Sequence, residues 1–546
     1  MKEYVIGVDY GTLSVRALLM DVTEGTELGT AEFVYPHGII GSDAFARIAP
    51  DQNMALQHPQ DYLDGFYQTV RQVVESCGVD PACVRGIGID FTSSTVMPVL
   101  EDGTPLCFLE QFRQEPQAFV KLWNHHSAQP EADAITELAR QRGERWLDLY
   151  GGKVSAEWLM PKLWEVLHKA PEVFDATARY LEAGDWLVWQ LTGQECHSSC
   201  MAGYKALWQK ETGYPANEFW KALDPRLENL IGTKISRDVC PVGTAAGVLT
   251  AEAAEKSGLV PGIAVTAPVI DAHAAVPAAG ITGPEKLMLI LGTSGCQHVL
   301  SKQLHDVPGI CGCVTDGIIP GFVAYEGGQS GYGDCFDWFV KNCVPESYSQ
   351  EAREKGVNIY TLLNEKAAKK DVGQNGLVVL DWWNGNRTPL ADFDLSGMIL
   401  GLTLKTKPED IYRAILEAAA FGTKAIVDLL TSSGIAIREV LAAGGISQKN
   451  PFLMQIISDV LGMPVRVSES AQAGARGAAV FAAAAGGCFD SLEAAAKAIA
   501  DPCRTEYTPN PENTAKYEKL YREYAELTAY FGKGANDVMK RLKKMQ

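Results

Sequence analysis

The sequence lacks an excess of positive charge and a long apolar run, and each absence excludes a class of protein. With 48 basic and 67 acidic side chains among 546 residues, the formal charge is −19. This balance gives no electrostatic footprint for general binding to nucleic acid or to an anionic membrane. No apolar run approaches the roughly 20 residues that span a bilayer, and the longest candidate, Ala478 to Cys488, is Ala-rich and predicted to be a buried helix. Any phosphorylated ligand must therefore be held by local positive charge, backbone N–H groups or a bound cation.

Paired cysteines are also lacking. The 13 cysteines are an odd number, spread over the chain without Cys-x-x-Cys spacing, so reduced thiols are favoured over disulfides or a zinc site. The first three residues lead directly into an apolar stretch, without the pattern of a secretory signal. We therefore expect a cytoplasmic enzyme or binding protein with neither a membrane nor a nucleic-acid partner.

One short pattern occurs twice along the chain. A strand, a small Gly-Thr turn and a return strand are predicted for residues 5–21 and again for residues 287–301. We interpret the repeat as an internal duplication that gives two related α/β domains. Residues 86–100 are predicted to form another strand–turn–strand, and the Trp-rich residues 110–230 an inserted helical region that carries substrate contacts. The expected units are an N-terminal domain with this insertion (residues 1–281), a C-terminal domain (282–490) and a helical tail packed on the second domain (491–546).

The two turns carry the strongest chemical signal. Small residues let backbone N–H groups approach an anion closely, and hydroxyl groups add donors, so such turns can bind phosphate. An ordinary hairpin turn that requires glycine is the alternative interpretation. Asp9 ends the strand before the first turn, where it either caps the turn or holds Mg²⁺ through water. The turn residues are Gly11, Thr12 and Ser14 in the first copy and Gly292, Thr293 and Ser294 in the second.

Three further features have two interpretations each. Gly444 and Gly445 end a predicted strand, where they form a simple loop or let adenine lie against the backbone. Asp271 lies between an apolar strand and a helix of small residues, and it either caps the helix or acts as a general base in a dry cleft. Glu326 precedes two glycines and is typical of a hydrogen-bond anchor, whereas Lys205 taken alone indicates a surface lysine. A P-loop is excluded and a dinucleotide fold is disfavoured, because neither glycine pattern occurs where it is needed.

Together these motifs resemble the FGGY carbohydrate kinases over nearly the whole chain. The shared order is the Asp9-Tyr10-Gly11-Thr12 turn, the Asp271 loop, the Gly292-Thr293-Ser294 turn, the Glu326-Gly-Gly-Gln loop and Gly444-Gly445. Longer stretches resemble the members of that family that phosphorylate L-ribulose; they are Asp90–Ser93, Leu122–His126, Gly151–Trp158, Ala202–Trp208, Gly309–Gly312 and Val378–Pro389.

The resemblance implies an α/β fold of two actin-like (ribonuclease H-like) domains. Each would have a mixed five-stranded sheet, and a central cleft between them would close on sugar and ATP. The implied reaction is the ATP- and Mg²⁺-dependent phosphorylation of L-ribulose to L-ribulose 5-phosphate in L-arabinose breakdown. A kinase for D-ribulose, xylulose or a polyol is an open alternative, as is a homodimer. A non-catalytic actin-like ATP-binding module is the rival from another class, but the short tail leaves no room for a peptide-binding domain.

The resemblance also implies roles for individual residues. Asp271 is the expected base and Asp9 the expected metal ligand. The aromatic run Asp381–Gly385 is expected to be a buried loop without an assigned role. Leu13, Asp337 and Lys449 depart from the glycerol kinase pattern, which leaves the nucleotide contacts open in detail. The expected sugar contacts are Ser93, Trp123, Lys205, Asp271 and Glu326. The expected ATP contacts are Gly11, Thr12, Ser14, Arg16, Gly292, Thr293, Gly333, Asp337, Gly444, Gly445 and Lys449.

Overall fold

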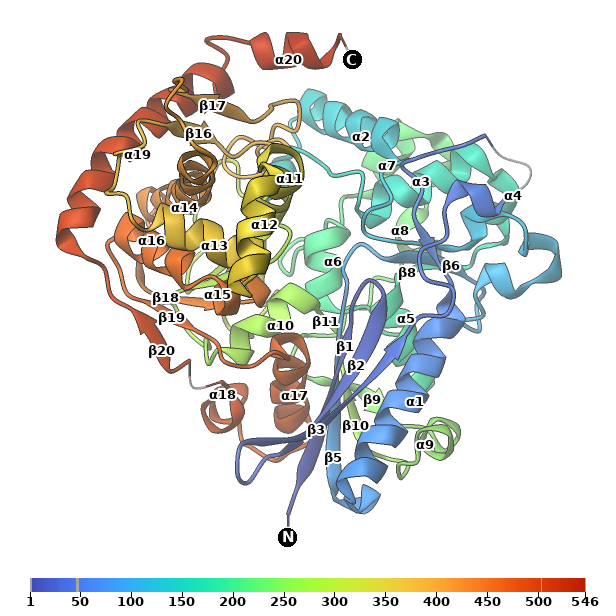
Figure 1. The fold of residues 1–546 in the computed structure, drawn as a ribbon. Coiled ribbons are helices and arrows are strands. Elements are labelled where there is room, and N and C mark those ends of the chain that lie inside the picture. Colours follow the sequence, from blue (N-terminus) through green and yellow to red (C-terminus); the bar gives the residue numbers. More distant parts are fainter. Residues whose placement is uncertain (1, 46–48, 502, 546) are drawn as a thin grey trace.

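The computed structural model describes residues 2–45, 49–501 and 503–545. Two large mixed sheets dominate it (Figure 1), with the first sheet low in the view, the second to the left and a helical region to the right. Over the ranges described, no helix combines the length and the apolar character that a membrane crossing needs.

The first sheet is built around the amino-terminal hairpin. β1 (Tyr4–Tyr10) and β2 (Ser14–Asp21) pair antiparallel as predicted, and β1 runs parallel to β5 (Val84–Phe91). The carboxyl ends of β1, β5 and β11 (Val269–Ile270) therefore meet at one edge. Within the described residues this sheet has seven strands, ordered β3-β2-β1-β5-β10-β9 with β11 beside β5, rather than the five that the family resemblance implied. The remaining strands are β3 (Thr26–Val34), β9 (Ala245–Val248) and β10 (Ala264–Thr266).

Two helices cover opposite faces of this sheet. Alternate residues of β2 divide between two cores: Val15 packs in the core that includes α1 (Pro59–Cys77), and Leu18 in the core that includes α17 (Ala473–Ala485). A Cβ added to Gly7 on β1 would lie 1.8 Å from the Ala475 carbonyl oxygen. Glycine in β1 thus allows the backbone of α17 to lie directly on the sheet.

The second sheet repeats this plan. β12 (Glu285–Leu291) and β13 (Gly295–Ser301) form the second predicted hairpin, and β12 runs parallel to β18 (Ile437–Ala443) as β1 does to β5. In the described residues this sheet also has seven strands, ordered β14-β15-β13-β12-β18-β19-β20. The other strands are β14 (Gly312–Thr315), β15 (Val323–Gln329), β19 (Val465–Val467) and β20 (Thr505–Tyr507).

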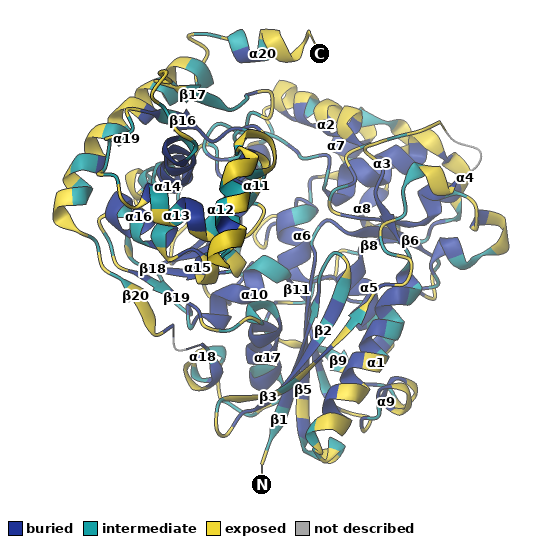
Figure 2. Ribbon diagram, in the orientation of Figure 1, coloured by how far each residue is buried: buried dark blue, intermediate teal, exposed yellow. Residues whose placement is uncertain are grey.

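Helices of the second half enclose that sheet. The long helix α14 (Pro408–Ser432) is largely buried, and Figure 2 shows it dark beneath more exposed helices. The tail is helical as predicted, and Tyr517 and Tyr524 of α19 (Pro511–Gly532) pack in the second core. The remaining elements here are α11 (Gly333–Cys343), α12 (Glu346–Lys355), α13 (Ile359–Ala367), β16 (Val378–Leu380), β17 (Met398–Leu400), α15 (Gly445–Lys449), α16 (Pro451–Leu461), α18 (Leu492–Ile499) and α20 (Val538–Lys543).

The predicted strand–turn–strand at residues 86–100 is wrong in one respect. β6 (Val96–Val99) does not return along β5 but joins a small sheet ordered β4-β7-β6-β8. A turn of small polar residues cannot reveal this, because the partner strands come from distant segments. The region predicted at residues 110–230 is helical, but its small sheet also takes β4 (Leu56–Gln57) and β6 from before residue 110. Its other elements are β7 (Val120–Lys121), β8 (Arg179–Glu182), α2 (Gln129–Arg142), α3 (Leu159–Lys169), α4 (Pro171–Ala176), α5 (Ala183–Thr192), α6 (Ser199–Lys205), α7 (Asn217–Leu223) and α8 (Leu230–Thr233), and α9 (Ala251–Ser257) follows it.

One short helix lies between the two large sheets. α10 (Asp271–Ala278) contacts β5 and α17 on one side and β12 and β13 on the other. Because α17 comes from the predicted second domain yet packs on the first sheet, the chain crosses between the two halves more than once. The domain limits at residues 281 and 490 stay a prediction. The position of α10 places its first residue, Asp271, where the two halves meet.

Candidate active site

Three carboxylates gather at the ends of β1, β5 and β11. Asp9 and Asp90 are register partners on adjacent parallel strands, and Asp271 directly follows β11, whose Val269 pairs with Asp90. A Cβ added to Gly474 at the start of α17 would lie 3.1 Å from Asp9 Cγ and 3.2 Å from Asp90 Oδ1. The carboxyl groups of Asp9 and Asp90 therefore face the same narrow space.

Burial perturbs all three carboxyl groups. Asp90 is fully buried, and in the described part of the chain the carboxyl group of Asp9 is the one group that hydrogen-bonds its oxygens. Burial, together with the charges of Asp9 and Asp271, holds its pKa well above the ordinary value, and burial also raises the pKa of Asp9. Oxygen-only groups of this kind are the ligands that Mg²⁺ prefers.

Asp271 lies at the amino-terminal end of α10. It is the first helical residue, whereas the capping position belongs to Ile270. Its Oδ1 accepts a 2.7 Å hydrogen bond from the Ala272 amide. Burial raises the pKa of Asp271 to about 7, with Asp9 and Glu326 adding to the effect and Lys205 opposing it. A base with a pKa near the working pH is well placed to accept a proton.

Lys205 and Glu326 form an ion pair that joins the two halves. Lys205 Nζ lies 3.5 Å from Glu326 Oε2, and its side chain is only 12% exposed, so the interpretation of Lys205 as a surface lysine is wrong. His273 Nε2 lies 3.0 Å from the same oxygen, and Cys200 Sγ lies 3.2 Å from His273 Nδ1. Burial opposes the ionisation of Glu326, but Lys205 and His273 outweigh it and hold its pKa well below the ordinary value.

A cavity that is partly open to solvent lies beside this pair. Its volume is about 420 Å³, within the usual range of small-molecule sites. Lys205 and Glu326 line it, together with Glu157 and Arg387, whereas Ser93, Trp123 and Asp271 do not. Its walls come from the inserted region on one side and from residues 387–394 on the other. The cavity offers both charged donors and charged acceptors to a polar ligand.

Ser93 and Trp123 lie on two loops that one buried lysine connects. Lys162 is fully buried, and its ammonium group donates to the carbonyl oxygens of Ser94 and Leu122 at 2.6 and 2.7 Å. Ser94 has a φ of 57°, a strained conformation for a residue with a side chain. Lys162 thus fixes the backbone next to both predicted sugar contacts.

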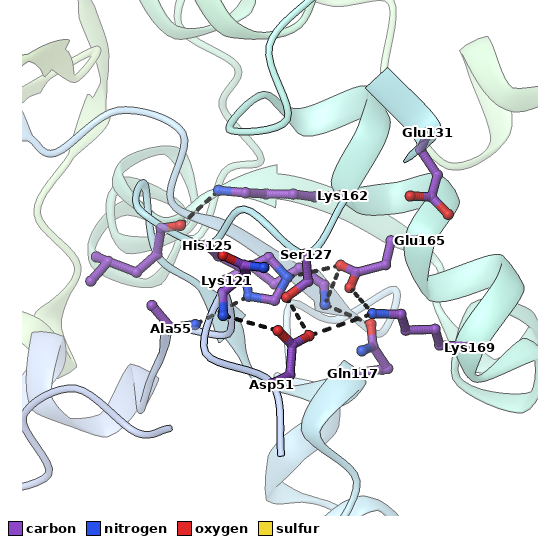
Figure 3. A network of polar contacts seen from close by, with 12 residues as sticks. Asp51, Ala55, Gln117, Lys121, His125, Ser127, Glu131, Lys162, Glu165 and Lys169 are labelled. Carbon is purple, nitrogen blue, oxygen red and sulfur yellow. Dashed lines mark hydrogen bonds and ion pairs between the residues drawn. The ribbon is translucent and has the colours of Figure 1, made fainter. Parts of the chain in front are cut away.

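A second buried network includes Lys121 and His125, the residues two positions before and after Trp123 (Figure 3). Glu165 Oε2 lies 3.1 Å from Lys121 Nζ and 2.9 Å from His125 Nε2, and all three side chains are buried. Burial, reinforced by the charge of Lys121, lowers the pKa of His125 to about 4. The histidine is therefore neutral and serves as a hydrogen-bonding residue. The loop after β7 is rigidly held.

The first predicted phosphate turn is partly occupied by internal contacts. Trp123 Nε1 donates to Thr12 Oγ1 at 3.1 Å, which brings a predicted sugar contact to a predicted ATP contact. Ser14 Oγ and the Arg16 guanidinium both hydrogen-bond Glu32 on β3, at 2.9 and 2.8 Å. Gly11 and Thr12 are therefore better placed than Ser14 and Arg16 to meet an incoming anion.

The predicted nucleotide residues of the second half converge at the ends of β12 and β18. The Gly333 amide donates to the Gly292 carbonyl at 3.1 Å, and the Thr293 carbonyl accepts from Tyr332 at 2.8 Å. Gly444 has a φ of 97°, and a Cβ there would lie 2.5 Å from the Leu291 oxygen, so only glycine fits. Gly445 follows as the exposed first residue of α15. Thr293 and these glycines thus form one surface.

Asp337 and Lys449 are less closely tied to this surface. Asp337 pairs with Lys341 at 2.6 Å along α11 and accepts from Tyr360 at 3.3 Å, and Lys449 is exposed at the end of α15. Across the described residues no hydrogen bond or ion pair joins either side chain to the glycines. Their predicted contact with nucleotide therefore has less structural support.

Comparison with known proteins identifies the family. A model of the FGGY family of carbohydrate kinases, N-terminal domain, matches residues 4–277, and one of the C-terminal domain matches residues 287–486. The chain belongs to the FGGY family of carbohydrate kinases. Membership of this family excludes the alternative interpretation as a non-catalytic ATP-binding module. It also confirms the expected fold class.

Curated relatives of this FGGY kinase match over their whole length. A protein named ribulokinase from Halalkalibacterium halodurans is 51% identical, over 100% of this chain and 98% of the relative. The ribulokinase of Geobacillus thermodenitrificans is 48% identical, over 99% of this chain and 97% of the relative. Among solved structures, xylulose kinase from Rhodospirillum rubrum has a TM-score of 0.80 and 24% identity, covering 96% of this chain and 98% of its own. The last likeness concerns the fold alone.

Sequence reasoning missed several residues of the kinase site. Asp90 ends a strand as Asp9 does, so the same argument could have found it. Lys162, His273, Glu157 and Arg387 carry no such signal, because each acts through contacts with segments far away in the sequence.

Proposed function

We propose that this kinase transfers a phosphoryl group from ATP to L-ribulose and forms L-ribulose 5-phosphate, as in L-arabinose breakdown in the cytoplasm. The observation that carries the proposal is the full-length likeness, at 51% identity, to a relative named ribulokinase. The cavity beside Lys205 and Glu326 supports it, since its volume suits a pentulose and its charges suit a ligand rich in hydroxyl groups.

In this proposal the sugar spans the gap between the two halves. Asp271 accepts the proton of the attacking hydroxyl, while Lys205 and Glu326 hold hydroxyl groups of the sugar. Ser93 and Trp123 contact it from the loops that Lys162 connects. Phosphoryl transfer depends mostly on the position of the reacting groups and on charge stabilisation. Asp271 begins α10, which packs against both sheets, so the base is held in a fixed position.

ATP binds across the two hairpin turns in the same proposal. Gly11, Thr12 and Thr293 meet the phosphates, and the glycine surface around Gly333 and Gly444 receives the adenosine. Mg²⁺ would fit beside Asp9, because in the described residues the buried oxygens of Asp90 contact no donor other than the Asp9 carboxyl group and carboxylate oxygens are hard ligands. The cation neutralises charge that develops on the phosphates.

Product analysis tests the proposal. The purified protein is incubated with ATP, Mg²⁺ and either L-ribulose, D-ribulose, D-xylulose, ribitol or glycerol, and ADP release is followed. We expect fastest turnover with L-ribulose and a phosphorus NMR signal coupled to the protons at C5. Faster turnover of another compound, or a phosphate on another carbon, would contradict the assignment while leaving the FGGY fold intact.

A further inference from the structure

Arg387 is a charged side chain that lines the cavity. It belongs neither to the hairpin turns nor to the carboxylate cluster, so its role is still open. It belongs to the loop that follows the aromatic run Asp381–Gly385. It lines the cavity together with Glu157, Lys205 and Glu326. We propose that Arg387 contacts the substrate, donating hydrogen bonds to the keto end of the sugar. The inference rests on the proposed function and adds the second half of the molecule to sugar recognition.

The aromatic run anchors the beginning of the loop. Asp381 is buried and accepts hydrogen bonds from Tyr524 of the tail helix α19 at 2.8 Å and from Gln329 of β15 at 3.0 Å. Trp382 is buried in the same core. The expectation of a buried loop is therefore confirmed for these first residues, and the run now has a role, because it fixes the loop to the tail and to β15.

The other end of the loop is fixed to β15 as well. The Thr388 amide donates to the Gly328 carbonyl at 3.1 Å, and the Gly328 amide donates to Thr388 Oγ1 at 3.2 Å. Cys311 Sγ lies 2.9 Å from the same hydroxyl. Two reciprocal hydrogen bonds therefore hold Thr388 beside the glycine pair that follows Glu326, and they fix the position of the preceding residue, Arg387.

Gly328 leaves the space that Arg387 occupies. A Cβ added to Gly328 would lie 2.9 Å from Arg387 Cδ and 3.3 Å from its Nη1, closer than such contacts normally are. The arginine side chain thus runs along the backbone that carries Glu326 and ends in the cavity. This close approach gives a reason for the second glycine of the Glu-Gly-Gly-Gln motif.

The guanidinium has no partner of its own. Among the residues that the structure describes, no hydrogen bond or ion pair ends on Arg387, although Glu157 and Glu326 lie close enough to favour its charged form. Arg387 is partly exposed in the cavity, and a guanidinium has five donors and no acceptor. A ligand that offers oxygen acceptors would pair it.

The position of the proposed base indicates which end of the sugar contacts Arg387. Asp271 does not line the cavity, whereas Arg387, Lys205 and Glu326 do. If the reacting 5-hydroxyl lies at Asp271, the opposite end with its C2 carbonyl extends into the cavity. A carbonyl oxygen can only accept hydrogen bonds, which matches a side chain that can only donate.

The test compares Arg387→Gln with the wild-type enzyme on two substrates. L-Ribulose carries the carbonyl, and ribitol is the corresponding alditol without it. Hydrogen bonds to charged groups are strong enough that we expect kcat/KM for L-ribulose to fall by about 10- to 100-fold, with a smaller fall for ribitol and the KM for ATP within twofold. Arg387→Lys should recover part of the loss, since it restores charge but not the planar fork.

Two further variants separate a substrate contact from a structural role. Arg353→Gln is the matched control, because it removes an exposed arginine of α12 that pairs with Glu346 and does not line the cavity; it should leave both substrates unaffected. Gly328→Ala displaces the arginine without removing it and should reproduce the loss for L-ribulose with a melting temperature close to that of the wild type.

The proposal is overturned if Arg387→Gln keeps kcat/KM for L-ribulose within twofold, or if the losses for ketose and alditol are equal. A fall in melting temperature with KM for ATP rising in parallel would also overturn it, because that result indicates a structural role. Failure of the proposed function looks different: the wild-type enzyme itself would then prefer a compound other than L-ribulose.

Discussion

Replacement of Asp271 by asparagine tests the role of this residue as a general base while keeping its other contacts. Asparagine keeps the size of the side chain and an oxygen that can accept the 2.7 Å hydrogen bond from the Ala272 amide. It removes only the charge and the ability to take a proton. Loss of a general base lowers the rate by about 10²–10⁴, so kcat should fall by that factor while KM for sugar and ATP changes by no more than a few-fold.

The effect of this variant on stability has a predicted sign. The pKa of Asp271 is raised from its ordinary value to about 7 in the folded protein, so the folded state binds more protons than the unfolded state between the ordinary value and pH 7. The wild type therefore loses stability as the pH rises through this window. Asparagine cannot ionise, so the melting temperature of the variant should equal or exceed that of the wild type at pH 8.

Steady-state kinetics and thermal unfolding of the same preparation decide the case. Asp371→Asn is the matched control, because this aspartate is exposed, pairs with Lys516 and lies outside the cavity; it should change neither measurement. A fully active Asp271→Asn enzyme would refute the assignment of the base. A large loss of activity together with a lowered melting temperature would instead indicate a structural role.

Three further predictions follow from the same site. Because Asp271 must be ionised to accept a proton, log kcat/KM should rise with unit slope below about pH 7 and level off above it; a flat profile from pH 5 to 8 would contradict this. Asp9→Ala and Thr293→Ala should lower ATP turnover far more than sugar affinity, measured by sugar binding in the absence of ATP. Lys162→Met should raise KM for L-ribulose about tenfold with KM for ATP unchanged, whereas Lys221→Met, at an exposed position of the same inserted region, should not; equal effects on both KM values would indicate general unfolding.

Local patterns were sufficient for the parts of the fold that short segments determine. The hairpins β1–β2 and β12–β13 follow directly from two short apolar runs on either side of a small Gly-Thr turn. The partner of β6 could not be found in this way, because its pairing with β8 depends on tertiary packing. The return of α17 to the first sheet was missed for the same reason: its Ala-rich sequence predicts burial but not against which sheet.

The residues of the candidate site also fall into those that local sequence predicts and those that depend on distant segments. Gly444 and the glycines of the turns have a local reason, since the backbone or a close neighbour permits no side chain. Lys205 was misjudged without the family resemblance, because its partner Glu326 lies on a strand of the other half. Arg387 lies in the stretch Val378–Pro389 that carries the family resemblance, but its own role gave no signal, since its position is set by hydrogen bonds between its loop and β15 that the sequence does not display.

The ratio of kcat/KM for L-ribulose to kcat/KM for D-xylulose tests the central claim most directly. Both ketopentoses carry the same C2 carbonyl and the same reacting C5 hydroxyl, so the ratio reports how well the pocket recognises the configuration of one sugar. The account predicts a ratio well above one, measured by ADP release at saturating ATP and Mg²⁺. A ratio below one would contradict the assignment of L-ribulose as the substrate.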